Sequence, residues 1–420
     1  MSAVAENLFP AAFDFEASVS DVAWLDRRRA DAFQRFRTSG IPHRRMEEWK
    51  YSDLRNALEA SRPPATTPKV ATDPFAAIAP AELIITNGRL GSTQLEQTLH
   101  GIELLDLCAL GDDAPDWVKC NLGEVLKGGA IGQASLALMK GGVALRITSE
   151  VVTPIHLRFV QKEDAVHSRV LIVAEPCASC VVLESHAPSE GVTNLGVEIV
   201  LASNARLSHV RLADAAPNAI SVEEIGVRSA RDSVYRAYLA QAGARLARVE
   251  LAIALDEEGA KAELTGAAAL AGKLHSDVTT HITHAAQKTA SRQLFKYVAA
   301  DHSRAVYQGK ITVAKGADGS DSLQTAKAIV LGERAEADLK PELEILADDV
   351  KCAHGAAVGD LDSDSLFYLR ARGIPEGEAR ELLLRAFLEE VVANIAPENV
   401  QAAVSRFIDG GLSQQRETAK

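Results

Sequence analysis

The chain has 420 residues, and its 57 Asp and Glu exceed its 45 Lys and Arg to give a formal net charge of −12. This acidic balance, with 5% aromatic residues, argues against a nucleic-acid binder, because phosphate neutralisation needs a basic surface and single-strand binding needs stacking rings. The 47% hydrophobic residues are enough to build a folded core. About two or three domains are expected at this length, unless one solenoid takes up most of the chain.

The N-terminal segment and the cysteines predict a soluble protein of the cytoplasm. Acidic residues stand where a secretion signal needs a basic segment followed by an apolar run, so export by that route is not expected. No apolar stretch approaches the roughly 18 residues that a membrane-spanning helix needs. Five cysteines are an odd and sparse set, which favours a reducing compartment over a disulfide framework.

Residues 1–115 are predicted to form an N-terminal helical domain that includes a proline-rich linker. Ser20 can cap a helix in which apolar residues recur at helical spacing. The segment 62–80 is rich in Pro, Thr and Ala, which is typical of a linker. A short strand is expected at Leu83–Thr86, with a turn at Asn87–Gly88.

Residues 116–358 are predicted to form the β core. From about Val143 apolar residues recur with a period of two, for example along Val249–Leu255. Short turns of one type separate these segments: Asn204–Arg206, Gly243–Arg245, Gly259–Lys261, Gly316–Asp318 and Glu333–Ala335. Many short strands with little helix between them form a sandwich, a barrel or a solenoid. The repeated turn favours a parallel β-helix, because each coil can then use the same corner, although the spacing is irregular.

Residues 359–420 are predicted to form a C-terminal helical domain. Asp362 can cap a first short helix. The apolar stripes of two further helices comprise Leu383, Ala386, Phe387, Val391 and Ile395, and then Val400, Val404, Phe407 and Ile408. The last helix is expected to stop at Gly410–Gly411. Helices appended to a β core can pack on that core or bind a partner, and packing is the simpler interpretation of either helix alone.

Two groups of possible metal ligands are better explained as structural residues. Cys177 and Cys180 have the C-x-x-C spacing of a zinc half-site or a redox pair, but they stand at a turn between strands and no second C-x-x-C exists. His275, His281 and His284 are close in sequence, but positions 281 and 284 point to opposite faces of a strand. Neither group is expected to bind a metal.

Cys352 and His354 form a different kind of pair. Residues two apart in a strand project from the same face, so a thiol and an imidazole lie side by side. These soft and borderline donors suit iron or an Fe–S unit. Two donors make half a site, and the spacing alone favours a core cysteine beside a surface histidine.

No pattern for nucleotide or ester chemistry is present: the sequence contains no P-loop, no G-x-G-x-x-G after a strand and no G-x-S-x-G. Two other function classes stay open. A carbohydrate-active β-helix enzyme would need an export signal, aromatic sugar platforms and clustered carboxylates, none of which is clear. A standalone thiol redox protein would depend on Cys177 and Cys180.

Two segments carry a resemblance to a known family. Residues 301–374 read DHSRAVYQGKITVAKGADGSDSLQTAKAIVLGERAEADLKPELEILADDVKCAHGAAVGDLDSDSLFYLRARGI, and residues 46–54 read MEEWKYSDL. Both resemble the SufB/SufD family of the SUF iron–sulfur cluster assembly system. The resemblance implies a right-handed parallel β-helix core flanked by N-terminal and C-terminal helical domains, in agreement with the strand and turn pattern.

The resemblance also implies a function. SufB-type chains carry cluster-building donors where this chain has Thr325, Ala335 and Asp338, so the chain is similar to the SufD branch. Such a chain is a non-enzymatic scaffold in a complex with a SufB-like subunit and a SufC-like ATPase, and it contributes to iron acquisition. His354, with Cys352 beside it, is then expected to bind a transient Fe–S cluster or iron at the interface with the SufB-like subunit.

The same resemblance assigns the C-terminal helices to the SufC-like ATPase. The partner-binding residues are then expected to be Leu383, Phe387, Val391 and Phe407. Replacing Phe387 with Asp should abolish binding of the ATPase and leave the chain folded. The resemblance leaves open whether a flavin binds the complex and whether the isolated chain forms a homodimer.

Overall fold

The computed structural model describes residues 11–13, 22–59, 73–78, 80–91, 100–393, 395 and 397–418. Ser20 and most of the predicted linker at 62–80 lie outside these ranges. Among the described residues, no helix is both long and apolar enough to cross a membrane.

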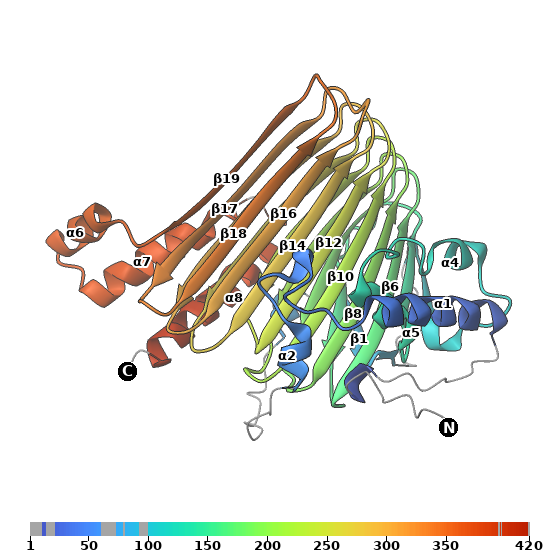
Figure 1. Cartoon of the computed structure of the whole chain (residues 1–420), viewed down its shortest axis with the longest axis horizontal. Coiled ribbons are helices and arrows are strands. Elements are labelled where there is room, and N and C mark those ends of the chain that lie inside the picture. The colour runs from blue at the N-terminus through green and yellow to red at the C-terminus, as the bar shows by residue number, and fades with distance from the viewer. Residues whose placement is uncertain are drawn as a thin grey trace.

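Two parallel sheets stack to form a β-solenoid (Figure 1). In spatial order, sheet A consists of β19 (Lys351–Gly359), β17 (Asp321–Leu331), β15 (Ala290–Ala300), β13 (Lys261–Leu270), β11 (Val234–Gln241), β9 (Arg206–Ala213), β7 (Ser179–His186), β5 (Ile155–Val160), β1 (Ala81–Thr86) and β2 (Arg89–Leu90). Sheet B consists of β18 (Glu336–Ile345), β16 (Arg304–Val313), β14 (His275–His284), β12 (Leu246–Leu255), β10 (Ile220–Ser229), β8 (Val192–Leu201), β6 (Ala165–Ala174), β4 (Gly142–Ile147) and β3 (Ile102–Asp106). From β4 onward, successive strands alternate between the sheets. The pairs from β4–β5 to β18–β19 make eight coils. The predicted parallel β-helix is therefore confirmed.

The interior of the solenoid is built by strand alternation. In β12, Val249, Leu251, Ile253 and Leu255 are buried in the main core cluster between the sheets, as their period of two predicts. Each strand pairs in register with the next strand of its own sheet, so equivalent residues of successive coils stack above one another. The expected strand and turn near Asn87 are also present, because β1 and β2 form a short antiparallel pair.

One corner of the solenoid repeats a left-handed backbone position. Its residues have φ between 54° and 76° and are Cys177, Asn204, Asp232, Gly259, Lys288 and Gly319. The next residue in each coil is small and buried: Ala178, Ala205, Ser233, Ala260, Thr289 and Ser320. The N–H of each left-handed residue donates to a carbonyl of the following coil, as from Asn204 to Arg231 at 2.8 Å. The corners therefore add to the sheet hydrogen bonds that join the coils.

The N-terminal helices cover the outer face of sheet B (Figure 1). They are α1 (Ala23–Ser39), α2 (Leu54–Glu59), α4 (Asp116–Asn121) and α5 (Ala130–Ala137), with the short 3₁₀ turns η1 (Ala11–Phe13), η2 (Glu47–Trp49) and η4 (Leu107–Ala109). The turn η3 (Ala76–Ile78) lies instead at sheet A, where Ile78 packs against the apolar cluster on its outer face. Helix α5 is almost entirely buried between α1 and the strands β6, β8 and β10. The segment predicted as the β core therefore begins with two helices. Whether 115 and 358 bound separate folding units stays a prediction.

The C-terminal helices are α6 (Ser363–Ala371), α7 (Glu376–Glu389) and α8 (Glu398–Thr418). Helices α7 and α8 pack on the outer face of sheet A through an apolar cluster. Asp362 accepts a hydrogen bond from the N–H of Ser365 at 2.6 Å, which is the predicted cap of α6. The predicted stop at Gly410–Gly411 is wrong, because α8 continues to Thr418. Gly411 lies against Ala269 of β13, so a residue without a side chain allows close packing there.

Candidate functional site

The last coil of the solenoid is open. In the described part of the chain, β18 and β19 each pair with a neighbour on one side only (Figure 1). Nearly all of β19 is exposed, and the apolar side chains of Leu346 and Val358 are 59% and 53% exposed. Pro341 stands within β18, a position that proline tolerates only on an edge strand because it has no N–H. An unpaired parallel edge of this kind is a template for a strand from another chain.

Cys352 and His354 lie on β19 at this open end. Cys352 is in register with Ser322 of β17, and His354 is in register with Gln324. Both residues of β17 are buried inside the solenoid, so Cys352 and His354 also belong to the inner face of the sheet. The same-face arrangement predicted from their spacing is therefore confirmed. Cys352 is half-buried and His354 is exposed, because no further coil covers them.

The coils directly behind this pair have a polar interior. The Oγ of Ser322 lies 2.8 Å from the Oγ of Ser291, which in turn lies 2.9 Å from Nε2 of His284. Gln324 donates to the hydroxyl of Tyr307 at 2.8 Å, and the Oε1 of Gln324 is buried without a partner in the described structure. The open end therefore combines these polar groups with a small apolar cluster around Ile311 and Val313, against which Cys352 packs.

The electrostatics of Cys352 favour the neutral thiol in the isolated chain. Burial raises the pKa of Cys352, and the negative charge of Asp321 acts in the same direction. A metal ion binds the thiolate, so binding here must displace the thiol proton. Among the described residues, no group of three potential ligands includes Cys352 or His354. In the described part of the chain, Cys352 and His354 are therefore two potential donors without a third beside them.

His275, His281 and His284, the histidines that are close in sequence, do not form a shared site. His281 is exposed, whereas His284 is fully buried and bonded to Thr289 and Ser291, so their predicted placement on opposite faces of β14 is confirmed. His275 lies 3.0 Å from the hydroxyl of Ser52. Burial lowers the pKa of both His275 and His284 to about 4.

Cys177 and Cys180 flank a corner of the solenoid. Cys177 is exposed and occupies the left-handed position with φ of 63°, while Cys180 is buried in β7. Burial raises the pKa of Cys180 to about 12, which disfavours the thiolate that redox exchange requires. Both cysteines are free thiols. The structure therefore lends no support to redox chemistry by this pair.

The four predicted partner-binding residues lie mostly against sheet A. Val391 is 1% exposed in the apolar cluster beneath the C-terminal helices, and Phe387 and Phe407 are half-buried at its border. Lys296 of β15 donates to the carbonyl of Phe387 at 2.9 Å and stands 4.4 Å from the centre of its ring. Leu383 is half-buried and lines a groove shared with Val358 of β19. These contacts show that Phe387 helps to hold α7 on the sheet.

A different set of apolar side chains on these helices faces solvent. Phe367 and Tyr368 of α6 are 73% and 56% exposed, and Leu382 of α7 is 43% exposed. Helix α6 has no buried residue and extends away from the sheets (Figure 1). Exposed aromatic residues on a helix that packs on little else are typical of a protein-binding surface.

Two clusters of acidic residues and histidine were not predicted from the sequence. One consists of Asp73, Glu82 and His156, and the other of Glu184, His186 and Glu223. In the first, Asp73 and Glu82 approach different nitrogens of His156, each at 3.8 Å. In the second, Nε2 of His186 lies 2.5 Å from Oε1 of Glu184, and 3.9 Å from Oε2 of Glu223. Strand β7 places Glu184 and His186 on one face, a signal the sequence does contain. The approach of Glu223 from sheet B depends on the coil and has no local signal.

Buried charge shapes the second cluster. Burial acts to raise the pKa of Glu184, but hydrogen bonds with His186 and His209 outweigh it and hold that pKa well below its ordinary value. Burial raises the pKa of Glu223 despite the nearby guanidinium of Arg211. The Nε of Arg211 lies 2.6 Å from Glu223 and 3.2 Å from Glu184. Two carboxylates therefore share one guanidinium in this cluster.

Comparisons with known proteins give a consistent result. The sequence profile described as "SUF system FeS cluster assembly, SufBD core domain" matches residues 157–387, and that of the "SufBD protein N-terminal region" matches residues 11–61. An iron–sulfur cluster assembly SufBD family protein of Synechocystis sp. is 30% identical over 88% of this chain and 87% of its own. The iron–sulfur cluster assembly protein SufD of Escherichia coli is 27% identical over 90% of this chain and 92% of its own. The corresponding SufD of Bacillus subtilis is 27% identical over 65% of this chain and 64% of its own.

Proposed function

The chain belongs to the SufBD family of SUF-system iron–sulfur cluster assembly proteins, and we propose that it is the SufD-like scaffold subunit of a SufB–SufC–SufD complex. The resemblance predicted from residues 301–374 and 46–54 is confirmed by the family matches. In this role the chain performs no catalytic step of its own. It holds iron or a transient Fe–S cluster at an interface and contributes to iron acquisition.

The observation that carries the proposal is the incomplete ligand pair at an unpaired sheet edge. Cys352 and His354 face inward on β19 with no further coil beyond them. A SufB-like solenoid that docks its own last coil on this end would cover both residues and could supply the missing thiolates. The edge N–H and C=O groups of β18 and β19 would pair with the partner at the same time.

The ligand role is tested with His354→Ala in the co-expressed complex. The variant should purify with the SufB-like and SufC-like subunits as the wild type does, but should contain less iron and sulfide, because one of the two ligands from this chain is lost. His281→Ala is the matched control, since His281 is an exposed imidazole on β14 away from the open end. Normal iron and sulfide content in His354→Ala would contradict the ligand role. Cys352→Ser tests the second ligand in the same way.

The SufC-like ATPase is proposed to dock on α6 and α7 through Phe367, Tyr368 and Leu382. These side chains are exposed on helices, whereas the stripe first expected to bind it is turned toward sheet A. Helix α7 is also bonded to the outer face of β15 through Lys296, so a movement of α7 imposed by the ATPase would be transmitted to the sheet that ends in β19.

The docking surface is tested with Phe367→Asp. A charge at the centre of an apolar contact should abolish co-purification of the ATPase while leaving the chain folded, because this ring packs on nothing buried. Val152→Asp is the control, since Val152 is 85% exposed elsewhere. Phe387→Asp, the variant predicted from the sequence, cannot separate loss of docking from loss of packing, because Phe387 also packs against Lys296. Undiminished co-purification of Phe367→Asp would exclude this surface.

A location in the cytoplasm is part of the proposal. It is supported by the five cysteines, all of which are free thiols. Assembly of iron and sulfide on reduced thiols also requires a compartment in which those thiols are not oxidised.

A further inference from the structure

We propose that Glu184, His186 and Glu223 form a second metal site, which binds one divalent first-row transition metal ion inside the solenoid. The site lies at the end of β7 and the start of β10, where sheets A and B face each other. It is separate from the open end, because six strand spacings of sheet A, roughly 29 Å, separate β7 from β19.

The ligand geometry is close to that of a bound ion. One ligand atom from each residue lies within 4.8 Å of the other two. Metal–oxygen and metal–nitrogen bonds of about 2.1 Å place neighbouring ligand atoms about 3 to 4 Å apart, so small side-chain movements would close the site. An ion bound to Nε2 of His186 replaces its hydrogen bond with Oε1 of Glu184, and the neutral imidazole then carries its single proton on Nδ1.

The buried carboxylate of Glu223 keeps one oxygen free for a ligand. This side chain is 1% exposed, its Oε2 is held by Arg211, and its Oε1 has no hydrogen-bond partner in the described structure, as is also true of Nη1 of Arg211. A buried carboxylate oxygen without a partner is costly, and a metal ion would satisfy it. His209 and Arg211 hold Glu184 through contacts of 3.0 Å and 3.2 Å, which orient this ligand from outside the site.

The charges of the cluster leave room for a divalent ion. Two ionised carboxylates and the guanidinium of Arg211 sum to −1 when the imidazoles are neutral. A divalent ion brings the sum to +1, and the carboxylate of Asp214, which lines the same hollows as His186, can balance it. Arg211 therefore limits the charge of the apo cluster but does not substitute for the ion.

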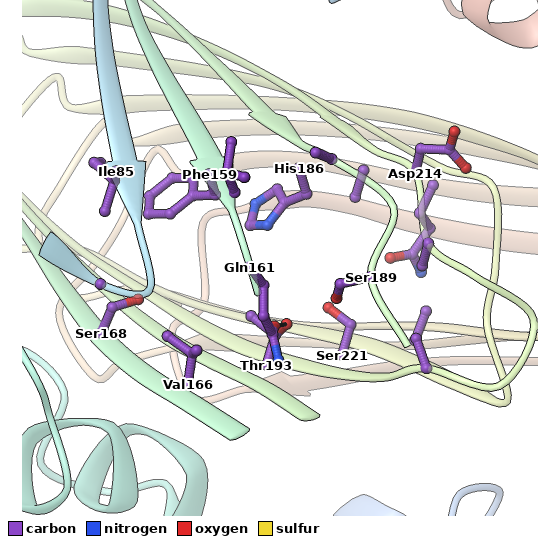
Figure 2. Close-up of a pocket in the computed structure, with 18 of the residues that line it drawn as sticks. Ile85, Phe159, Gln161, Val166, Ser168, His186, Ser189, Thr193, Asp214 and Ser221 are labelled. Atoms are coloured by element: carbon purple, nitrogen blue, oxygen red, sulfur yellow. Dashed lines mark hydrogen bonds between the residues drawn. The ribbon is translucent and has the colours of Figure 1, made fainter. Parts of the chain in front are cut away.

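One edge of the cluster, at His186, reaches the surface, while Glu184 and Glu223 lie behind it. His186 lines two surface hollows, one bordered by Phe159 and Gln161 and the other by Asp73. Figure 2 shows His186 beside Phe159 within the first hollow, where the two rings stack with their centres 4.9 Å apart. Gln161, Thr193 and Ser221 line the path with polar groups, so a hydrated ion could shed its water gradually.

The ligand set selects the metal class. One imidazole and two carboxylates, with no thiolate, suit Fe²⁺, Mn²⁺ or Zn²⁺ more than soft ions such as Cu⁺. The choice of Fe²⁺ as the physiological ion rests on the proposed function, since only that function brings iron to this chain. The existence of the site rests on the cluster itself.

The site is tested by titrating the purified full-length chain with Mn²⁺ under anaerobic conditions and following the free ion by electron paramagnetic resonance. The wild type should bind one Mn²⁺ per chain at this site, and Fe²⁺ should compete. Glu223→Gln and His186→Asn should each weaken binding at least about tenfold, because each removes a ligand. His281→Ala and Glu263→Gln should bind as the wild type does, since the first alters an exposed imidazole of β14 and the second an exposed carboxylate of β13.

Three outcomes would overturn the site: no binding by the wild type, unchanged binding by both ligand variants, or an equal loss of binding in His281→Ala. Circular dichroism checks that the variants are folded. If either ligand variant is unfolded, anomalous diffraction from wild-type crystals soaked in Mn²⁺ tests the site instead. The anomalous peak must then lie within bonding distance of His186. If the chain does not bind Mn²⁺, the proposed complex and the His354→Ala test are unaffected. If instead the proposed function is wrong, the chain should still bind Mn²⁺ at this site.

Discussion

Cys177 shows how backbone position decides what a residue can do. It occupies the same left-handed corner as Asn204, Asp232 and Gly259 in later coils, so its side chain is set by the solenoid and not by a metal or a partner thiol. The C-x-x-C pattern arises because the corner is followed by a buried alanine and then by the start of β7. The C-x-x-C spacing alone does not distinguish a structural corner from a redox pair. The equivalent corner positions in later coils, which are not cysteines, do distinguish them.

We expect Cys177→Val to lower the free energy of unfolding by about 1–2 kcal/mol, because a branched side chain is strained at positive φ. Cys177→Gly and Cys177→Asn should be neutral or stabilising at the same position. Urea denaturation followed by circular dichroism measures the three variants. Equal destabilisation by valine and glycine would indicate that the thiol itself matters.

Glu224 predicts a pH dependence of stability. Burial, together with the negative charge of Glu250, raises its pKa from 4.5 to about 7, while the N–H of Gly132 donates to it at 2.7 Å. Because the folded state favours the protonated carboxyl, stability from this group is full below pH 4.5 and is lost as the pH rises through about 7. The loss corresponds to about 3 kcal/mol.

Glu224→Gln should therefore match the wild type near pH 4.5 and be more stable at pH 8, since glutamine can still accept from Gly132 and carries no charge. The free energy of unfolding measured at both pH values checks this. Glu263→Gln, at an exposed carboxylate, is the control. A constant difference between variant and wild type at the two pH values would contradict the assignment.

At the scale of elements, α8 shows why a pair of glycines did not end a helix. The stripe of apolar residues continues past Gly410 to Leu412, which is buried against sheet A. Packing on the sheet outweighs the low helix propensity of glycine, a preference that local sequence patterns do not contain.

The two glycines of α8 should respond differently to alanine. Gly410 has open space where a Cβ would lie, so Gly410→Ala should stabilise the chain by about 0.5–1 kcal/mol. At Gly411 a Cβ would come within 3.3 Å of Ala269, so Gly411→Ala should gain less or lose stability. Denaturant midpoints of the two variants give the comparison. An equal gain at both positions would mean that α8 is not packed closely on β13.

At the scale of the whole molecule, the sequence predicts the repeating parts well and the assembled parts poorly. Alternation along β12 and the recurring corner at Asn204 and Gly259 are local, so they predict strands and coils. The same-face pair Cys352 and His354 is local too. Which side of α7 meets the sheet is not encoded locally, and neither is the burial of Val391, which follows the helix.

The acidic–histidine cluster shows the same limit most clearly. Glu184 and His186 share a strand, but Glu223 reaches them only after the chain has completed a further coil in between. Glu223 comes close to Glu184 because of the register between β7 and β9 and of the strands in the facing sheet. The spacing of residues along the sequence does not determine that register. Ligands brought together by coiling must be found in three dimensions.

The stacking of coils also restricts where the chain can tolerate insertions. Helices α7 and α8 are attached to β13 and β15, while the last strand is β19, two strand spacings or about 10 Å beyond β15. An additional coil inserted after β15 would lengthen the separation between α7 and β19 by about 5 Å. A partner that contacts both the C-terminal helices and the edge strand would then no longer fit. A coil inserted before β11 would leave this separation unchanged. Length differences among natural relatives should accordingly fall on the N-terminal side of β11, and alignments that place whole-coil insertions after β15 would contradict this.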